Sequence, residues 1–224
     1  MHHSKPYIPK QMPTSHTVII KNLGLTDYQE TWLKMQEFNS KRNQTTLDEI
    51  WCLQHMPVYT LGLAGKQDHL LTETEIPIIR SDRGGQITYH GPGQLIIYVM
   101  INLKRKNLLV RNLITTLEQA VIDYLATINC KAKNNLNARG IYVQNKKIAS
   151  IGLRVSKGCS FHGIAINIDM DLSPFQNINP CGIKNLSMTQ IKDIDPNCKL
   201  NQIQTQLILY LTKQLNYTKV LTNH

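Results

Sequence analysis

The sequence lacks the features that define several large classes of protein. No run of apolar residues approaches the about 18 that a membrane-spanning helix needs. The first residues contain no apolar segment of the kind found in secretory signals. Neither a Gly-x-Gly-x-x-Gly nor a Walker-type phosphate loop occurs, which argues against a Rossmann fold or a nucleotide site of that kind. We therefore expect a cytoplasmic protein with no membrane association.

Cysteine pairs and metal motifs are missing as well. The five cysteines, at positions 52, 130, 159, 181 and 198, are odd in number and irregularly spaced, and no Cys-x-x-Cys occurs. The eight histidines are scattered, and none forms a convincing helical pair. This usage is typical of free thiols in a reducing compartment. We expect no metal and no cofactor.

Composition and length predict one folded domain. The chain has 224 residues, of which 42% are hydrophobic and 18% charged. Residues 1–15 hold three prolines and little pattern, so we expect an N-terminal arm there and a single catalytic domain over residues 16–224. The net charge of +10 favours an acidic partner, which by charge alone could be a nucleic acid, an anionic membrane or a protein. The densest basic cluster, residues 104–106, is typical of a solvated loop, and we expect no nucleic acid to bind.

Helical and strand periodicities are mixed without a regular βαβ alternation, so the sequence predicts an α+β fold with a mixed, largely antiparallel sheet and packed helices. A helix should follow Thr26, which forms a possible capping box with Gln29. Asn145-Lys146 and Lys157-Gly158 should join three strands into a meander of hairpins. Strands are expected over residues 17–21, 48–55, 76–80, 94–102, 140–144, 147–155 and 160–169, and further helices over residues 108–128 and 201–215.

Four segments could carry chemistry. Residues 83–94 combine four glycines with an arginine and a histidine, and such a loop can bring backbone N–H groups close to a ligand. Lys147 opens a strand with small residues, although a lysine in that position is usually solvated. Gly163 interrupts the strand 160–169, which indicates a bulge or a close ligand. Cys181 lies between Pro180 and Gly182, on a turn from which its sulfur could project into a cleft.

Taken together and in order, these segments resemble the lipoyl(octanoyl) transferase family. The similarity runs from about His55 to Thr189 and includes His55-Met56-Pro57-Val58-Tyr59-Thr60 and Asn179-Pro180-Cys181-Gly182. It departs from many relatives at Gln54 and at residues 138–140. The resemblance implies the fold shared with biotin- and lipoate-protein ligases.

The resemblance also implies an activity and its residues. An octanoyl group would pass from octanoyl-acyl carrier protein to a lysine of lipoyl domains, in 2-oxoacid dehydrogenase complexes and in the glycine cleavage H protein. Cys181 would be the nucleophile and Lys147 its proton partner. The implied substrate-binding residues are Arg83, Gly84, Gly85, Gln86, Ile87, Thr88, Tyr89, His90, Ser150, Ile151, Gly152, Gly163, Ile164 and Ala165.

Three other activities stay open at this point. An ATP-dependent lipoate- or biotin-protein ligase would share the layout, but it would give the cysteine and lysine no role. An amidotransferase that moves octanoyl between lipoyl domains would also use a cysteine. A basic nucleic-acid-binding module would explain the charge but none of the four segments.

Overall fold

A computed structural model describes residues 16–135 and 138–223, so the predicted arm over residues 1–15 lies outside the described residues. Two sheets and three α-helices make up the described part. The larger sheet has the strand order β11-β1-β2-β6-β10-β9-β8-β7, and the smaller has the order β4-β3-β5. The division into an arm and one catalytic domain remains a prediction.

The bounds of the elements are as follows. The larger sheet contains β1 (Thr17–Thr26), β2 (Asp48–His55), β6 (Gln94–Met100), β7 (Lys133–Asn134), β8 (Ile141–Val143), β9 (Lys146–Ser156), β10 (Cys159–Asn167) and β11 (Lys219–Asn223). The smaller contains β3 (Val58–Leu61), β4 (Ile78–Arg80) and β5 (Ile87–His90). The α-helices are α1 (Tyr28–Lys41), α2 (Val110–Thr127) and α3 (Leu200–Gln214), and the 3-10 turns are η1 (Gln67–His69), η2 (Ser173–Asn177), η3 (Pro180–Gly182) and η4 (Ile191–Asp193).

The sheet is mixed, as the sequence predicts. Strand β1 pairs in parallel with both β2 and β11, and β3 pairs in parallel with β4, whereas the other pairs are antiparallel. Strands β8, β9 and β10 form the expected meander of hairpins. The first turn lies one residue earlier than predicted, because Gln144 and Asn145 take the two positive φ angles of 49° and 64°. The second turn lies at Lys157 and Gly158, as expected.

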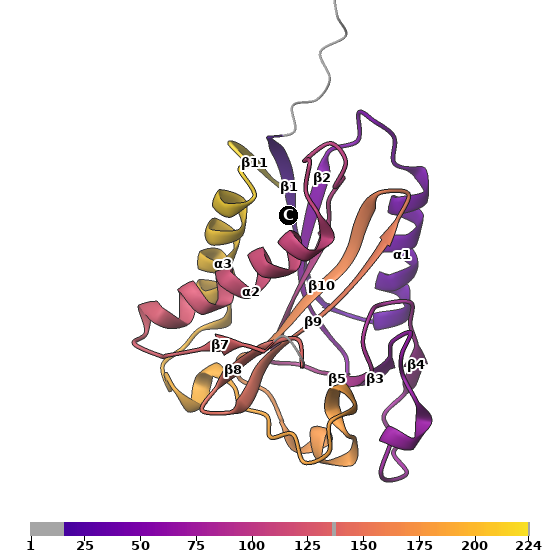
Figure 1. The fold of residues 1–224 in the computed structure, drawn as a ribbon, viewed down its shortest axis with the longest axis vertical. Helices are drawn as coiled ribbons and strands as arrows, with labels where there is room; N and C mark the ends of the chain where they lie inside the picture. The colour runs from indigo at the N-terminus through magenta and orange to yellow at the C-terminus, as the bar shows by residue number, and fades with distance from the viewer. Residues whose placement is uncertain (1–15, 136–137, 224) are drawn as a thin grey trace, which may run out of the picture.

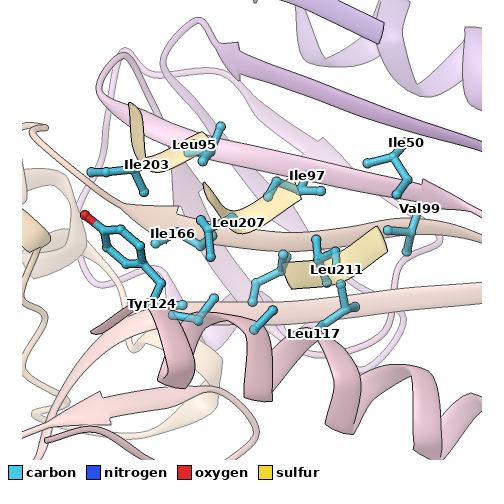
Figure 2. Packing of buried hydrophobic residues seen from close by; sticks show 14 of the residues in the cluster. Ile50, Leu95, Ile97, Val99, Leu117, Tyr124, Ile166, Ile203, Leu207 and Leu211 are labelled. Carbon is cyan, nitrogen blue, oxygen red and sulfur yellow. The ribbon is translucent and has the colours of Figure 1, made fainter. Parts of the chain in front are cut away.

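Helices cover both faces of the larger sheet (Figure 1), which explains why β6 is buried throughout. Leu95, Ile97 and Val99 face α2 and α3, and together with residues of these helices they form the main core (Figure 2). The alternate residues of β6, including Ile96 and Tyr98, belong to a second cluster with α1. The candidate site lies on the face that α1 covers.

The start of α1 differs from the prediction. Thr26 is the last residue of β1, and Asp27 is the N-cap, with a side chain that accepts a hydrogen bond of 2.9 Å from the backbone N–H of Glu30. An aspartate at this position both satisfies a free N–H group and complements the helix dipole. The predicted capping box between Thr26 and Gln29 is therefore wrong. Within the described residues, no helix combines the length and the apolar content needed to cross a bilayer.

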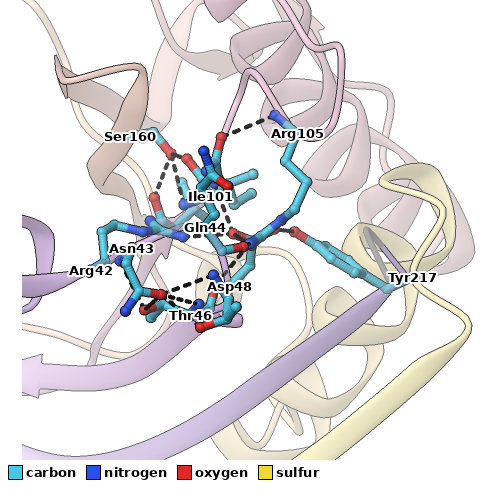
Figure 3. Close-up of polar contacts among 12 residues, drawn as sticks. Arg42, Asn43, Gln44, Thr46, Asp48, Ile101, Arg105, Ser160 and Tyr217 are labelled. Carbon is cyan, nitrogen blue, oxygen red and sulfur yellow. Dashed lines mark hydrogen bonds and ion pairs between the residues drawn. The ribbon is translucent and has the colours of Figure 1, made fainter. Parts of the chain in front are cut away.

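Asp48 joins four parts of the fold through one buried carboxylate (Figure 3). Its Oδ1 accepts hydrogen bonds from Arg42 Nη2 at 2.8 Å and Arg105 Nη2 at 2.6 Å, and also from the backbone N–H of Asn102 at 2.8 Å. Its Oδ2 accepts from the Tyr217 hydroxyl at 2.8 Å. The side chain of Asp48 is 1% exposed and that of Arg42 is 3% exposed. The carboxylate thus ties the end of α1, the segment after β6 and the lead-in to β11 to the start of β2.

We predict that Asp48→Asn lowers the free energy of unfolding by about 3–5 kcal/mol, because it leaves two largely buried guanidinium groups without their counter-charge. Urea denaturation with a constant m-value would measure the loss. Glu37→Gln is the control, because Glu37 pairs with Lys41 on the exposed surface and its loss should leave unfolding nearly unchanged. A similar small effect for both variants would contradict the structural role of Asp48.

Candidate active site

Cys181 lies on a strained turn that points its sulfur into a cavity. Its φ and ψ are 58° and 19°, a left-handed conformation that is uncommon for a residue other than glycine. Gly182 follows with a φ of 75°, and a Cβ there would lie 3.1 Å from Gln86 Cγ. The turn is also anchored by the backbone N–H of Asn179, which donates to the carbonyl of His69 at 2.8 Å. The surrounding loops therefore hold the cysteine in place.

The side chain of Lys147 is buried beside this sulfur. Lys147 is 0% exposed, and its Nζ donates to Cys181 Sγ at 2.9 Å and to the Arg139 carbonyl at 2.6 Å. Its Nζ also lies 5.5 Å from the centre of the Tyr142 ring. No ion pair among the described residues includes Lys147. A lysine at the start of a strand is usually exposed to solvent. Lys147 is not, because other segments of the chain cover its side chain.

Backbone pairing explains how two residues 34 positions apart come to meet. The N–H of Lys147 donates to the Ser187 carbonyl at 2.8 Å, and the N–H of Thr189 donates to the Lys147 carbonyl at 3.0 Å. This short parallel bridge fixes the segment that follows Cys181 along the start of β9. The position of the sulfur relative to the amine therefore depends on the sheet and not on the turn alone.

Gly140 leaves the space that the lysine side chain occupies. Its φ is 140°, and a Cβ there would lie 2.4 Å from Lys147 Cε and 3.0 Å from Nζ. A Cβ would also come within 2.4 Å of the Ala149 carbonyl oxygen. The sequence analysis placed Gly140 at the start of a predicted strand and noted residues 138–140 as a departure from many relatives. Neither observation indicated that Gly140 makes room for Lys147.

The cavity next to Cys181 has a volume of about 230 Å³. Most of the predicted substrate-binding residues line it: Arg83, Gly85, Gln86, Ile87, Thr88, His90, Ser150, Ile151, Gly152, Gly163, Ile164 and Ala165. Two do not. The N–H of Gly84 bonds to the Leu153 carbonyl at 3.0 Å, and the Tyr89 ring packs against Phe175 in a separate apolar cluster. The lining residues outside this implied substrate-binding set are Tyr28, Ile96, Tyr98, Ala138, Arg139 and His162.

The neighbouring strand, and not the cavity, explains why residue 163 is a glycine. A Cβ there would lie 1.9 Å from the Ile97 carbonyl oxygen on the neighbouring strand. The group that approaches Gly163 closely is the backbone of β6, and the expected close ligand stays a prediction.

Arg83 places a buried guanidinium in the cavity wall. Arg83 is 8% exposed, and it donates from Nε to Thr60 Oγ1 at 3.0 Å and from Nη1 to the Gly84 carbonyl at 2.9 Å. Burial lowers the pKa of Arg83, and the neighbouring Tyr28 and Cys181 oppose that shift. No ion pair among the described residues includes Arg83, so its charge is available to an anionic group in the cavity.

Two buried histidines, His90 in the cavity wall and the neighbouring His55, have lowered pKa values. Burial lowers the pKa of His55 to about 4, and burial together with His55 and Arg83 holds the pKa of His90 well below its ordinary value. His55 Nε2 is 2.7 Å from the Tyr98 hydroxyl, and His90 Nδ1 is 2.7 Å from Gln94 Oε1. Among the described residues, no group of three His, Cys, Asp or Glu side chains is placed to hold a metal ion.

Comparisons with known proteins agree with these features. The model of the lipoyl protein ligase A/B catalytic domain matches residues 27–212. An octanoyltransferase from Erwinia tasmaniensis is 51% identical over 204 residues, covering 91% of this chain and 92% of the relative, and one from Haemophilus influenzae is 50% identical over 206 residues, covering 91% and 97%. A structure of a bipartite lipoate protein ligase with its E2 lipoyl domain, from Thermoplasma acidophilum, has a TM-score of 0.75 at 14% identity and covers 93% of this chain and 88% of that one.

The last similarity shows the fold alone, and it confirms the predicted ligase-like α+β architecture. The other two comparisons cover most of the chain at high identity. The protein is therefore an enzyme that belongs to the octanoyltransferase family, within the lipoyl protein ligase A/B catalytic domain family.

Proposed function

We propose that this enzyme transfers octanoyl from octanoyl-acyl carrier protein to a lysine of lipoyl domains through a thioester on Cys181. The acceptors would be the lipoyl domains of 2-oxoacid dehydrogenase complexes and the glycine cleavage H protein. The observation that carries the proposal is the distance of 2.9 Å between Lys147 Nζ and Cys181 Sγ at the edge of the cavity. Five free cysteines, three of them buried, fit work in a reducing cytoplasm.

In the first step the Cys181 thiolate attacks the carbonyl carbon of the donor thioester. A new C–S bond forms, the carrier's C–S bond breaks, and the carrier leaves as a thiol after taking a proton from the ammonium of Lys147, which becomes neutral. A thiolate is the reactive form of cysteine, and the adjacent ammonium of Lys147 stabilises it. One thioester replaces another, so the intermediate costs little free energy.

In the second step the amine of the incoming lysine attacks the same carbonyl carbon. The bond to Cys181 Sγ breaks, an amide forms, and the amine loses a proton. Lys147, once neutral, is the group placed to accept that proton. The guanidinium of Arg83 still has a second Nη1–H, and this group can stabilise the negative charge that develops on the carbonyl oxygen.

The cavity supplies affinity for the acyl chain. Ile87, Ile96 and Ala165 give it an apolar lining. Burial of six methylenes, at about 0.8 kcal/mol each, would contribute roughly 5 kcal/mol. The cavity can thus favour medium chains over short ones.

Charge near the cavity suits acidic protein partners. The chain carries a net charge of +10. Arg139, which lines the cavity, and Lys184, three residues after Cys181, are both exposed. Such groups steer the encounter with an acidic carrier protein or lipoyl domain, and the encounter should slow as salt is raised.

The contact between Lys147 and Cys181 also favours a transferase over the alternatives. An ATP-dependent ligase would activate a free acid and would not use this pair. Transfer from octanoyl-acyl carrier protein without ATP would exclude a ligase mechanism. Comparison of octanoyl-acyl carrier protein with an octanoylated lipoyl domain as donor would distinguish the amidotransferase.

We predict that Cys181→Ser forms no thioester adduct when it is incubated with octanoyl-acyl carrier protein, because serine lacks the acidity to act as the nucleophile there. Intact-mass analysis before and after hydroxylamine would detect the adduct. Cys198→Ser is the matched control, because Cys198 is also partly exposed but does not line the cavity, and it should form the adduct as the wild type does. A hydroxylamine-labile adduct on Cys181→Ser would exclude Cys181 as the nucleophile.

We predict that Lys147→Ala slows transfer by about 10²–10⁴-fold, because the variant removes both the thiolate's cation and the proton acceptor. Single-turnover rates of acylation and of transfer to the lipoyl domain would show which step is affected. Lys146→Ala, which alters the exposed neighbouring lysine, should behave as the wild type. Normal single-turnover rates in a folded Lys147→Ala protein would remove Lys147 from the mechanism.

We predict that Gly140→Ala slows the acylation of Cys181 by about 100-fold, because the added Cβ displaces the side chain of Lys147. The rate should be normalised to the folded fraction measured by circular dichroism. Gly24→Ala is the control: Gly24 also has a positive φ, of 67°, but a Cβ there meets nothing within 4 Å. Equal acylation rates in the two variants would show that the space at Gly140 is not required.

A further inference from the structure

The sheet face under α1 carries small side chains on some strands and large ones on others. Residues that pair directly across neighbouring strands share a face of the sheet, and one such row crosses four strands. From β9 to β2, this row contains Ser150, Ala165, Ile96 and Leu53. The first two side chains are small and the last two are large. The cavity lies over the small half of the row, and Ile96 is the first large side chain that lines it.

The large half of the row is closed by packing. Ile96 is 1% exposed and Leu53 is 2% exposed, and both belong to one buried cluster with Met35 of α1. In the neighbouring row, Tyr98 of β6 pairs with Trp51 of β2, and these two residues belong to the same cluster. An apolar chain that crosses the small half therefore meets packed side chains at β6.

Other side chains close the cavity on both sides of this row. On one side, the side-chain amide of Gln94 donates to Asn167 Oδ1 at 2.9 Å, one alternate position along the same face of β6 and β10. On the other side, the side chain of Arg83 covers Gly152, where a Cβ would lie 3.2 Å from Arg83 Cδ. The open path therefore follows the row itself and leads to Ile96.

The width of the small half matches the reach of an octanoyl chain. The chain starts beside β9, because Lys147 belongs to that strand and its Nζ lies 2.9 Å from Cys181 Sγ. From β9 to β6 the sheet spans two strand spacings, which is about 10 Å. An octanoyl thioester has seven carbon–carbon bonds of about 1.5 Å in a zigzag and so also reaches about 10 Å from the sulfur. Its last carbon therefore comes to the side chain of Ile96.

We propose that Ile96 limits the acyl chain that the cavity accepts to about eight carbons. The inference rests on the acyl-Cys181 intermediate proposed above, and it names the class of donor that can load the enzyme. A longer chain has to push Ile96 into the packed cluster under α1 or fold back on itself within the cavity. The affinity gained from buried methylenes disfavours short chains, and the wall at Ile96 excludes long ones.

The experiment measures the rate of Cys181 acylation with decanoyl- and with octanoyl-acyl carrier protein, and takes the ratio of the two rates. In the wild type the decanoyl rate should be about tenfold to a hundredfold below the octanoyl rate, because two extra methylenes overpack the cavity. Ile96→Ala removes three carbons from the wall. Its ratio of decanoyl to octanoyl rates should exceed that of the wild type by at least about tenfold.

Ile97→Ala is the matched control. It deletes the same three carbons from the next residue of β6, which is also buried but packs on the other face of the sheet with α2 and α3 (Figure 2). Its ratio should equal that of the wild type. Because each ratio compares two donors on one protein, a loss of folded protein affects both rates equally.

A milder pair of variants covers the case in which Ile96→Ala does not fold. Ile96→Val removes one carbon, a change that most cores tolerate. Its ratio of nonanoyl to octanoyl rates should exceed that of the wild type by about tenfold, because the one carbon added to the chain fits the space of the one removed. Ile97→Val should leave that ratio unchanged.

The outcomes separate this inference from the proposed function. If octanoyl does not load onto Cys181 of the wild type, the acyl-enzyme proposal fails. If octanoyl loads and decanoyl loads equally fast, the limit at eight carbons is overturned. If the variants of Ile96 give the same ratios as the matching variants of Ile97, Ile96 does not set the limit. In the last two cases the octanoyl transfer stands.

Discussion

The active site depends on the burial of one amine against one sulfur. An ammonium group in a protein interior is costly unless it is hydrogen-bonded, and Lys147 Nζ has two partners there, Cys181 Sγ and the Arg139 carbonyl. Each nearby irregularity serves this contact. Gly140 leaves room for the lysine, the left-handed backbone of Cys181 turns the sulfur inward, and the bridge at Lys147 fixes the two chain segments together. Unpairing either group would leave a buried polar atom without its partner.

The two faces of the larger sheet have different roles: one holds the apolar core that stabilises the fold, and the other holds the cavity. Under α2 and α3, Leu95, Ile97 and Val99 of β6, together with Ile164 and Ile166 of β10, belong to a continuous apolar core (Figure 2). Under α1, the same strands contribute Tyr98, Gly163 and Ala165 to the cavity wall, and His162 joins them through its unusual backbone angle. The cavity is therefore built on rigid strands, and such support holds reacting groups more accurately than loops do.

Much of the architecture could be predicted because local patterns and tertiary packing agree. The apolar run of β6, the periodicity of α2 and the spacing of the hairpins each identified an element. Long-range pairing was not predictable: the parallel contact of β1 with β11 joins the two ends of the domain, and no local pattern encodes it. In the smaller sheet a strand was predicted only at residues 76–80, where β4 lies, and β3 and β5 were missed because each has only four residues. At the start of α1, two adjacent residues were both plausible caps, and only the structure distinguishes them.

The candidate site could be predicted from the sequence only in part. Ordered motifs led to Cys181 and Lys147 as candidate catalytic residues, but neither residue type nor spacing showed that the lysine is buried. His162 belongs to one of the motifs, but the direction of its side chain depends on a positive φ. The glycine that follows it was only a weak sign of that backbone conformation. Ala138 and Arg139 reach the cavity because β8 turns back beside β9, which is a property of the fold and not of their own sequence.

The central claim is that the thioester on Cys181 lies on the reaction path. The most direct measurement isolates the octanoylated enzyme, removes the donor and mixes it rapidly with an unmodified lipoyl domain. The account predicts that octanoyl moves to the domain's lysine at a rate at least equal to the steady-state turnover. An octanoylated enzyme that keeps its acyl group, or releases it more slowly than turnover, would contradict the account.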